Sequence, residues 1–163
     1  MIKKNITDII NKQINAELYS AYLYLAMAAW CQGENLTGFA HWLKVQAKEE
    51  TGHAMRFYKY LEDRSADIAL KGIETPPASW NSVLAAFADA YKHEQKVTGM
   101  IYDIVNLATK EGDHATASML KWFVDEQVEE EAQTLEIVNK LKMIGESKGS
   151  LLYLDKTLAK REG

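Results

Sequence analysis

Proline occurs only twice in this chain of 163 residues, and the two stand side by side at Pro76–Pro77. Because proline breaks the interior of a helix, its absence elsewhere leaves long stretches free to be helical. In those stretches apolar residues recur every three or four positions, the spacing of a helix with one buried face. No segment shows the alternating pattern of a strand. The chain is therefore predicted to be all-α.

Glycines and capping residues divide the pattern into four long helices and a short one, expected at about residues 5–31, 36–63, 79–110, 113–144 and 150–161. Ser79, Asp113 and Ser150 are the candidate N-caps of the last three. The apolar face of the first helix is expected to comprise Ile14, Leu18, Ala21 and Leu25.

The lengths of the connections predict how the helices are arranged. Only a few residues join the first helix to the second and the third to the fourth, so each pair should be an antiparallel hairpin. The link over 64–78 is different. Its roughly fifteen residues can reach about 50 Å, whereas a helix of about 28 residues is about 42 Å long. The second and third helices can therefore run parallel in a four-helix bundle with one long crossover.

Composition excludes several functions. The formal charge of −4 argues against nucleic acid or an acidic membrane as the main partner. Cys31 is the only cysteine, so the chain has no disulfide framework. No apolar stretch approaches the roughly 20 residues of a membrane span. The first ten residues contain no secretory signal, and we expect a cytoplasmic protein.

Each long apolar face is interrupted near its middle by residues that can bind a metal: Glu17 in the first helix, Glu50 and His53 in the second, Glu94 in the third, and Gln127 and Glu130 in the fourth. Mid-helix positions of packed helices share one layer, so these side chains should converge. A single glutamate on such a face more often curls to the surface. Several buried together repel one another, and the faces carry no lysine or arginine to neutralise them. A bound cation is the simplest way to neutralise these carboxylates.

The spacing of these residues favours a particular metal. Glu50 and His53 are three positions apart and point from one helical face, and Gln127 and Glu130 repeat that spacing. Carboxylates with one imidazole suit iron or manganese. Two glutamates from two helices, with Glu-x-x-His segments from two others, form the di-iron carboxylate pattern. Here Gln-x-x-Glu replaces the second Glu-x-x-His segment.

The acidic run at 125–131 is in large part a solvated face. Within it, Glu126, Glu129 and Glu130 lie within one turn, and Glu49 adjoins Glu50, so a further cation could bind beside the pair. Spacing alone leaves this open. Tyr24 lies two turns from Glu17 on the same face and can approach the site, although tyrosines are common in cores.

Three long segments resemble the non-haem ferritins of bacteria and archaea: NAELYSAYLYLAMAAW (15–30), NLTGFAHWLKVQAKEETGHAMRFYKYL (35–61) and WFVDEQVEEEAQTLEIV (122–138). Glu94 and the fifth helix agree as well, so the resemblance covers nearly the whole chain. It implies one ferritin-like domain over 1–163, in which a four-helix bundle at about 5–144 is followed by the short C-terminal helix.

The resemblance also implies an activity and its residues. It suggests oxidation of Fe(II) by dioxygen or hydrogen peroxide at a di-iron site, with storage as ferric mineral in a homo-oligomeric shell of 24 subunits. One iron would be held by Glu17, Glu50 and His53, and the second by Glu50 as bridge, Glu94 and Glu130, with Gln127 close by. A third iron would match Glu49, Glu126, Glu129 and Glu130. The tyrosine at Tyr24 would assist electron transfer.

Haem is not expected. Bacterioferritins use Glu-x-x-His twice and bind haem through a methionine of the second helix, whereas this chain has Thr51 and Gly52 there and ends its second motif in Glu130. Two rivals remain at this stage. One is a small di-iron oxidase or peroxidase without storage, and the other is a structural bundle without metal.

Overall fold

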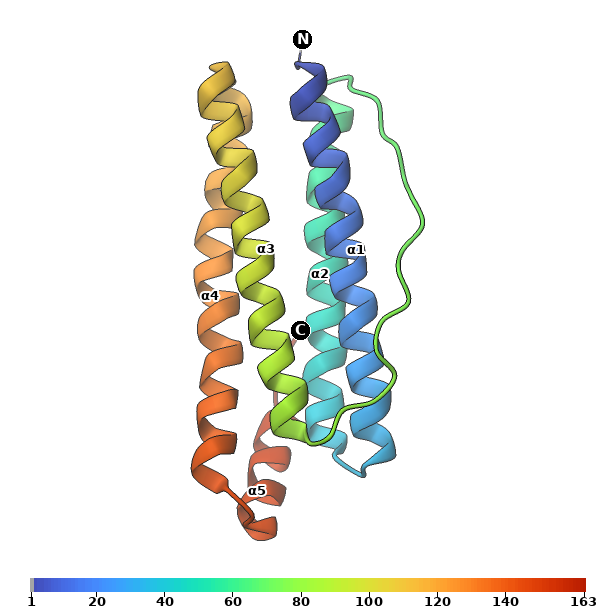
Figure 1. Ribbon diagram of the computed structural model, residues 1–163, viewed down its shortest axis with the longest axis vertical. Coiled ribbons are helices and arrows are strands. Elements are labelled where there is room, and N and C mark those ends of the chain that lie inside the picture. The colour runs from blue at the N-terminus through green and yellow to red at the C-terminus, as the bar shows by residue number, and fades with distance from the viewer. Residues whose placement is uncertain (1) are drawn as a thin grey trace.

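The computed structural model describes residues 2–163, and this part of the chain contains helices and no strand. The helices are α1 (Lys4–Gly33), α2 (Thr37–Asp63), α3 (Val83–Glu111), α4 (His114–Ile144) and α5 (Lys148–Leu158). The first four lie side by side as a bundle, and α5 lies at one end of it (Figure 1). This is the predicted all-α, four-helix bundle with a short fifth helix.

The tight connections produce the two expected hairpins. Between α1 and α2 the chain turns through Asn35, whose φ is 61°. Between α3 and α4, Gly112 takes a left-handed conformation with φ of 68°, and Asp113 accepts a hydrogen bond from the Thr116 N–H at the start of α4. The predicted cap at Asp113 is thus confirmed.

The crossover over 64–82 passes along the outside of α1 from one end of the bundle to the other (Figure 1). Two asparagines of α1 hold it there. The Asn11 amide donates to the Asp67 carbonyl at 2.9 Å and accepts from the Ala69 N–H at 2.8 Å. The Asn15 amide donates to the Gly72 carbonyl at 3.2 Å. As a result α2 and α3 run parallel, as the length of the link predicted.

Three local predictions were wrong. The third helix begins at Val83 and not near Ser79, because the Ser82 side chain accepts from the Ala85 N–H and caps the helix there. Ser147, and not Ser150, caps the fifth helix for the same reason, since its hydroxyl accepts from the Ser150 N–H. On α1, Leu25 is 48% exposed, while Tyr24 lies fully inside the core.

The core consists of two apolar clusters, one toward each end of the bundle. One cluster includes Ile10, Ile14, Phe57, Leu61 and Ile101. The other includes Met27, Phe39, Leu43, Phe87 and Leu141. Along α1 and α2, Glu17 and Glu50 fall between residues of the two clusters. The polar layer of the bundle is therefore enclosed by apolar packing on both sides.

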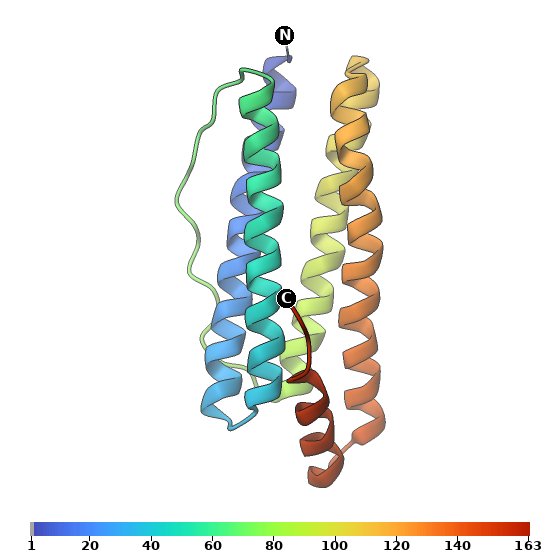
Figure 2. The same cartoon turned by 180° about the vertical axis from the view of Figure 1, so that it is seen from behind.

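The fifth helix docks against the start of α2. The Asp155 carboxylate accepts hydrogen bonds from the N–H groups of Gly38 and Phe39, at 2.9 and 3.0 Å. The last residues then turn back along α2 (Figure 2). Among the described residues, no helix is long and apolar enough to cross a membrane.

Candidate metal centre

Every helix of the bundle contributes to one buried polar layer. The ligand-type residues named above are between 1% and 5% exposed: Glu17 from α1, Glu50 and His53 from α2, Glu94 from α3, and Gln127 and Glu130 from α4. The structure thus brings these six side chains together. Five of them, all except Gln127, form three groups together with Glu126, and each group could hold a metal ion.

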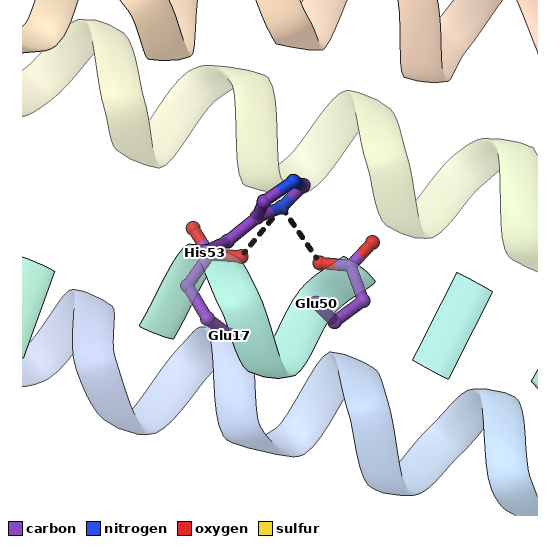
Figure 3. A group of neighbouring side chains, drawn as sticks. All are labelled: Glu17, Glu50 and His53. Atoms are coloured by element: carbon purple, nitrogen blue, oxygen red, sulfur yellow. Dashed lines mark ion pairs between the residues drawn. The ribbon is translucent and has the colours of Figure 1, made fainter. Parts of the chain in front are cut away.

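The first group consists of Glu17, Glu50 and His53 (Figure 3). The Nδ1 atom of His53 lies 3.3 Å from Glu50 Oε2 and 4.0 Å from Glu17 Oε2. Residues three apart on α2 present the imidazole and one carboxylate to the same point, and α1 supplies the other carboxylate. All three ligands therefore come from the first hairpin.

The second group consists of Glu50, Glu94 and Glu130, whose ligand atoms lie within 4.8 Å of one another. It joins the two hairpins, since α2 supplies Glu50 while α3 and α4 supply the other two carboxylates. Glu50 belongs to both groups. A carboxylate has two oxygens and can bind one ion with each, so Glu50 is placed to bridge two neighbouring ions.

A third group combines His53 with Glu126 and Glu130, and His53 Nε2 lies 3.8 Å from Glu126 Oε1. It differs from the set that the sequence predicted for a third ion. Glu49 is paired instead with Arg161, at 2.6 Å, and Glu129 accepts from the Gln133 amide at 2.7 Å. The structure therefore places Glu126 and Glu130 at the centre and Glu49 and Glu129 beside it.

Electrostatics at the centre favour a cation. Burial raises the pKa of Glu17, Glu50 and Glu94 above the usual range of a glutamate. It raises the pKa of Glu130 to about 9, with a further contribution from the neighbouring Glu50 and Glu94. Within residues 2–163, Glu17 Oε2 is the one buried side-chain oxygen or nitrogen without a hydrogen-bond partner. A divalent ion would both neutralise the carboxylates and give this oxygen a partner.

Buried amides orient the carboxylates from outside. Gln13 donates to Glu17 at 2.7 Å. Gln46 donates to Glu50 at 2.8 Å and to Glu130 at 2.7 Å. Such partners fix the direction of metal ligands. The sequence analysis missed both amides, although each stands four positions before a glutamate on the same helical face, which is a readable signal.

Gln127 lies in the same layer as a donor. Its amide nitrogen is 3.2 Å from Glu94 Oε2 and 3.2 Å from the Thr98 hydroxyl. The amide therefore supports Glu94 in the same manner as Gln46 supports Glu50.

Tyr24 reaches the centre from α1. It is fully buried, and its hydroxyl donates to Glu94. Burial and the adjacent Glu94 raise the pKa of the phenol well above its usual value, so it stays protonated. Its ring also lies 6.5 Å, centre to centre, from that of His93, whose Nε2 is 2.7 Å from the Ser20 hydroxyl. Tyr24 thus contacts a candidate ligand directly through its hydroxyl.

A four-helix bundle with one long crossover, and with two acidic groups that share Glu50 at its middle, is the arrangement of the ferritin-like carboxylate proteins. A family model described as the ferritin-like domain matches residues 7–144. The chain belongs to the ferritin family.

Individual relatives agree along the whole length. The chain is 39% identical over 161 residues to a bacterial non-heme ferritin of Staphylococcus aureus, covering 99% of this chain and 97% of the relative. It is 40% identical to the bacterial non-heme ferritin of Staphylococcus saprophyticus, with 99% and 96% covered. The open pore ferritin of the hyperthermophilic archaeon Archaeoglobus fulgidus superposes with a TM-score of 0.99 at 47% identity, covering 99% of both chains.

Proposed function

We propose that this chain oxidises Fe(II) at the buried centre and stores the iron as ferric mineral inside a homo-oligomeric shell. The observation that carries the proposal is the sharing of Glu50 between two buried acidic groups, which suits a pair of substrate ions held side by side. In this proposal Glu17, Glu50 and His53 bind one Fe(II). Glu50, Glu94 and Glu130 bind the other, with Gln127 as a supporting donor.

The ligand set favours oxidation of the substrate. Hard carboxylate oxygens stabilise Fe(III) more than Fe(II), which lowers the reduction potential of the bound iron. Each Fe(II) gives up one electron, and hydrogen peroxide accepts the two, or dioxygen accepts them to form peroxide. Tyr24, hydrogen bonded to Glu94, stands where it can assist this electron transfer. Hydrolysis of the Fe(III) then releases protons as the mineral grows.

Four further parts of the proposal rest on the resemblance to the ferritins. A third iron position would involve Glu49, Glu126, Glu129 and Glu130, and no haem would take part. The shell would contain 24 subunits, and the protein would act in the cytoplasm. Large apolar side chains on the outer surface support assembly, among them Leu25 at 48% exposed, Leu152 at 61% and Tyr153 at 76%.

Aerobic loading of the metal-free protein with Fe(II) tests the proposal. Iron is counted per particle in the size-exclusion peak while oxidation is followed by absorbance. We expect hundreds of iron atoms or more in a large particle. Two or three per chain without further uptake would instead indicate a di-iron oxidase or peroxidase, and no uptake would indicate a structural bundle.

A double variant links the activity to the centre. Glu50→Gln with Glu94→Gln keeps the side-chain volumes while removing two carboxylates, and should slow oxidation by orders of magnitude. Glu146→Gln removes a carboxylate that is exposed just beyond α4 and should leave the rate unchanged. Normal oxidation in the double variant would refute the assignment of the site.

A further inference from the structure

The C-terminal tail docks on α2 at a defined place. After α5 the chain turns back toward the middle of the bundle (Figure 2). His41 Nε2 lies 2.8 Å from the Arg161 carbonyl oxygen, and Arg161 Nη1 donates to the Trp42 carbonyl at 3.3 Å. The guanidinium carbon lies 4.2 Å from the centre of the Trp42 ring. These contacts fix the Arg161 side chain, which is 12% exposed.

The positive charge of Arg161 lies among acidic residues beside the metal centre. Its Nη2 atom is 2.6 Å from Glu49 Oε2. The same nitrogen is 3.4 Å from Gln133 Oε1, and the Gln133 amide nitrogen donates to Glu129 at 2.7 Å. Two of the four acidic residues proposed for the third iron are therefore held by this guanidinium, one directly and one through a single amide.

Arg161 also fixes an amide of the centre itself. Its Nη2 donates to Gln46 Oε1 at 2.9 Å. Since the oxygen of that amide is then engaged, its nitrogen is turned toward Glu50 and Glu130, to which it donates. The tail is thus connected by hydrogen bonds to the bridging carboxylate.

We infer that Arg161 is an internal cation that competes with the third metal ion for Glu49, so that the docked tail and a metal at that position exclude one another. This inference rests on the proposed function. A metal ion bound to the Glu49 carboxylate would face the guanidinium at short range, and two cations repel. Because coupling between two binding events is reciprocal, docking of the tail weakens the third metal, and the third metal releases the tail.

The competition lowers the affinity of the third position for a metal ion relative to the first two. The carboxylates proposed for the first two ions accept hydrogen bonds from neutral side chains and, among the described residues, form no ion pair with a lysine or arginine. Those ions therefore bind without displacing a lysine or arginine. The third has to displace Arg161 before it can use Glu49. Iron at the third position is therefore held weakly, which suits an ion that must move on toward the mineral.

Zn(II), which does not change oxidation state here, is the probe. Metal-free protein is titrated calorimetrically, and hydrogen exchange of the peptide containing Lys160 and Arg161 is followed by mass spectrometry in the assembled protein. The two amides donate to the Thr157 and Leu158 carbonyls when the tail is docked. We expect their exchange to be unchanged by the first two equivalents and to accelerate with the third.

Arg161→Gln should raise the affinity for the third Zn(II) by about fivefold or more, and should accelerate exchange in the tail without metal. Lys160→Gln is the matched control, because it removes the same charge from an exposed neighbouring position. A third equivalent that appears only in Arg161→Gln would also support the inference.

The experiment distinguishes refutation of the competition from refutation of the proposed function. If the first two equivalents bind and the affinity for the third is the same in the wild type and Arg161→Gln, the competition is refuted while the proposed function stands. The same conclusion follows if neither protein binds a third equivalent. The same holds if the tail keeps its protection with the third ion bound. Loss of the first two equivalents would refute the proposed function and the inference with it.

Discussion

Asp155 caps α2 from the opposite end of the chain: its carboxylate accepts the N–H groups of Gly38 and Phe39 at 2.9 and 3.0 Å. The first N–H groups of a helix have no partner within it, and α2 receives no side-chain cap from its own N-cap residue, Leu36. Asp155→Ala should therefore destabilise the metal-free protein by about 1 kcal/mol. Thermal unfolding measures this, with Asp103→Ala, an exposed carboxylate on α3, as the control. Equal melting temperatures in the two variants would show that the cap contributes nothing.

Gly38 provides the space for this contact. A methyl group at Gly38 would overlap the backbone carbonyl of Asp155, so Gly38→Ala should force α5 away from α2. We expect faster hydrogen exchange throughout α5 and impaired assembly of the proposed shell. Gly99→Ala is the control, because a methyl group at that helical position meets nothing within 4 Å. An intact shell with a protected α5 in Gly38→Ala would contradict the close approach.

Tyr24→Phe removes the hydroxyl that donates to Glu94 while leaving Gln127 as a donor to the same carboxylate. The fold and the binding of two Zn(II) ions should persist. The first turnover of Fe(II) oxidation, followed by stopped flow, should slow severalfold. Tyr22→Phe alters an exposed tyrosine of the same helix and is the control. A rate equal to that of the wild type would restrict Tyr24 to packing.

Gln46→Leu tests whether the outer amides matter for metal binding. The change removes the donor to Glu50 and Glu130, and loss of such a partner costs about 10–100-fold in metal affinity. Calorimetric titration with Zn(II) measures the effect on the first two equivalents. Gln32→Leu, at an exposed position of α1, should bind as the wild type does. Unchanged affinity in Gln46→Leu would mean that the ligands hold their directions without it.

The raised pKa values predict how the stability of the metal-free protein depends on pH. A carboxyl whose pKa is higher in the folded state binds more protons there than in the unfolded chain, so the free energy of unfolding falls as pH rises. The contribution of Glu130 is fully present below the unfolded pKa of about 4.3 and is lost as pH rises to about 9. The melting temperature should therefore decrease across this range. Glu130→Gln should flatten the decrease, and saturating Zn(II) should abolish it. An identical pH profile in Glu130→Gln would contradict the shift.

Much of this architecture could be predicted from the order of residues. The four long helices follow from the local periodicity of apolar residues. The two hairpins and the crossover follow from the distance that each connection can span. The convergence of Glu17, Glu50, His53, Glu94 and Glu130 followed from their position at mid-helix. The resemblance to ferritins added the assignment of roles to these residues.

Other features depend on contacts that periodicity does not encode. Ser79 was predicted to cap the third helix, whereas Ser82, three residues later, accepts from the Ala85 N–H and begins it. Leu25 and Tyr24 are neighbours on α1, and only the neighbouring helices determine which one faces inward. The contact of Arg161 with Glu49 joins residues 112 positions apart and arises from the reversal of the chain after α5. No local sequence pattern predicts such a contact.

The division of the centre between the two hairpins has a consequence for the order of events during synthesis. The group of Glu17, Glu50 and His53 belongs wholly to residues 1–63, whereas the second group needs Glu94 and Glu130 as well. Because the ribosome delivers the N-terminal half first, one set of ligands is complete as soon as α1 pairs with α2. Docking of the later hairpin then adds two carboxylates to a partly built centre. The first hairpin thus carries one complete group by itself, and the second hairpin brings the carboxylates that complete the other.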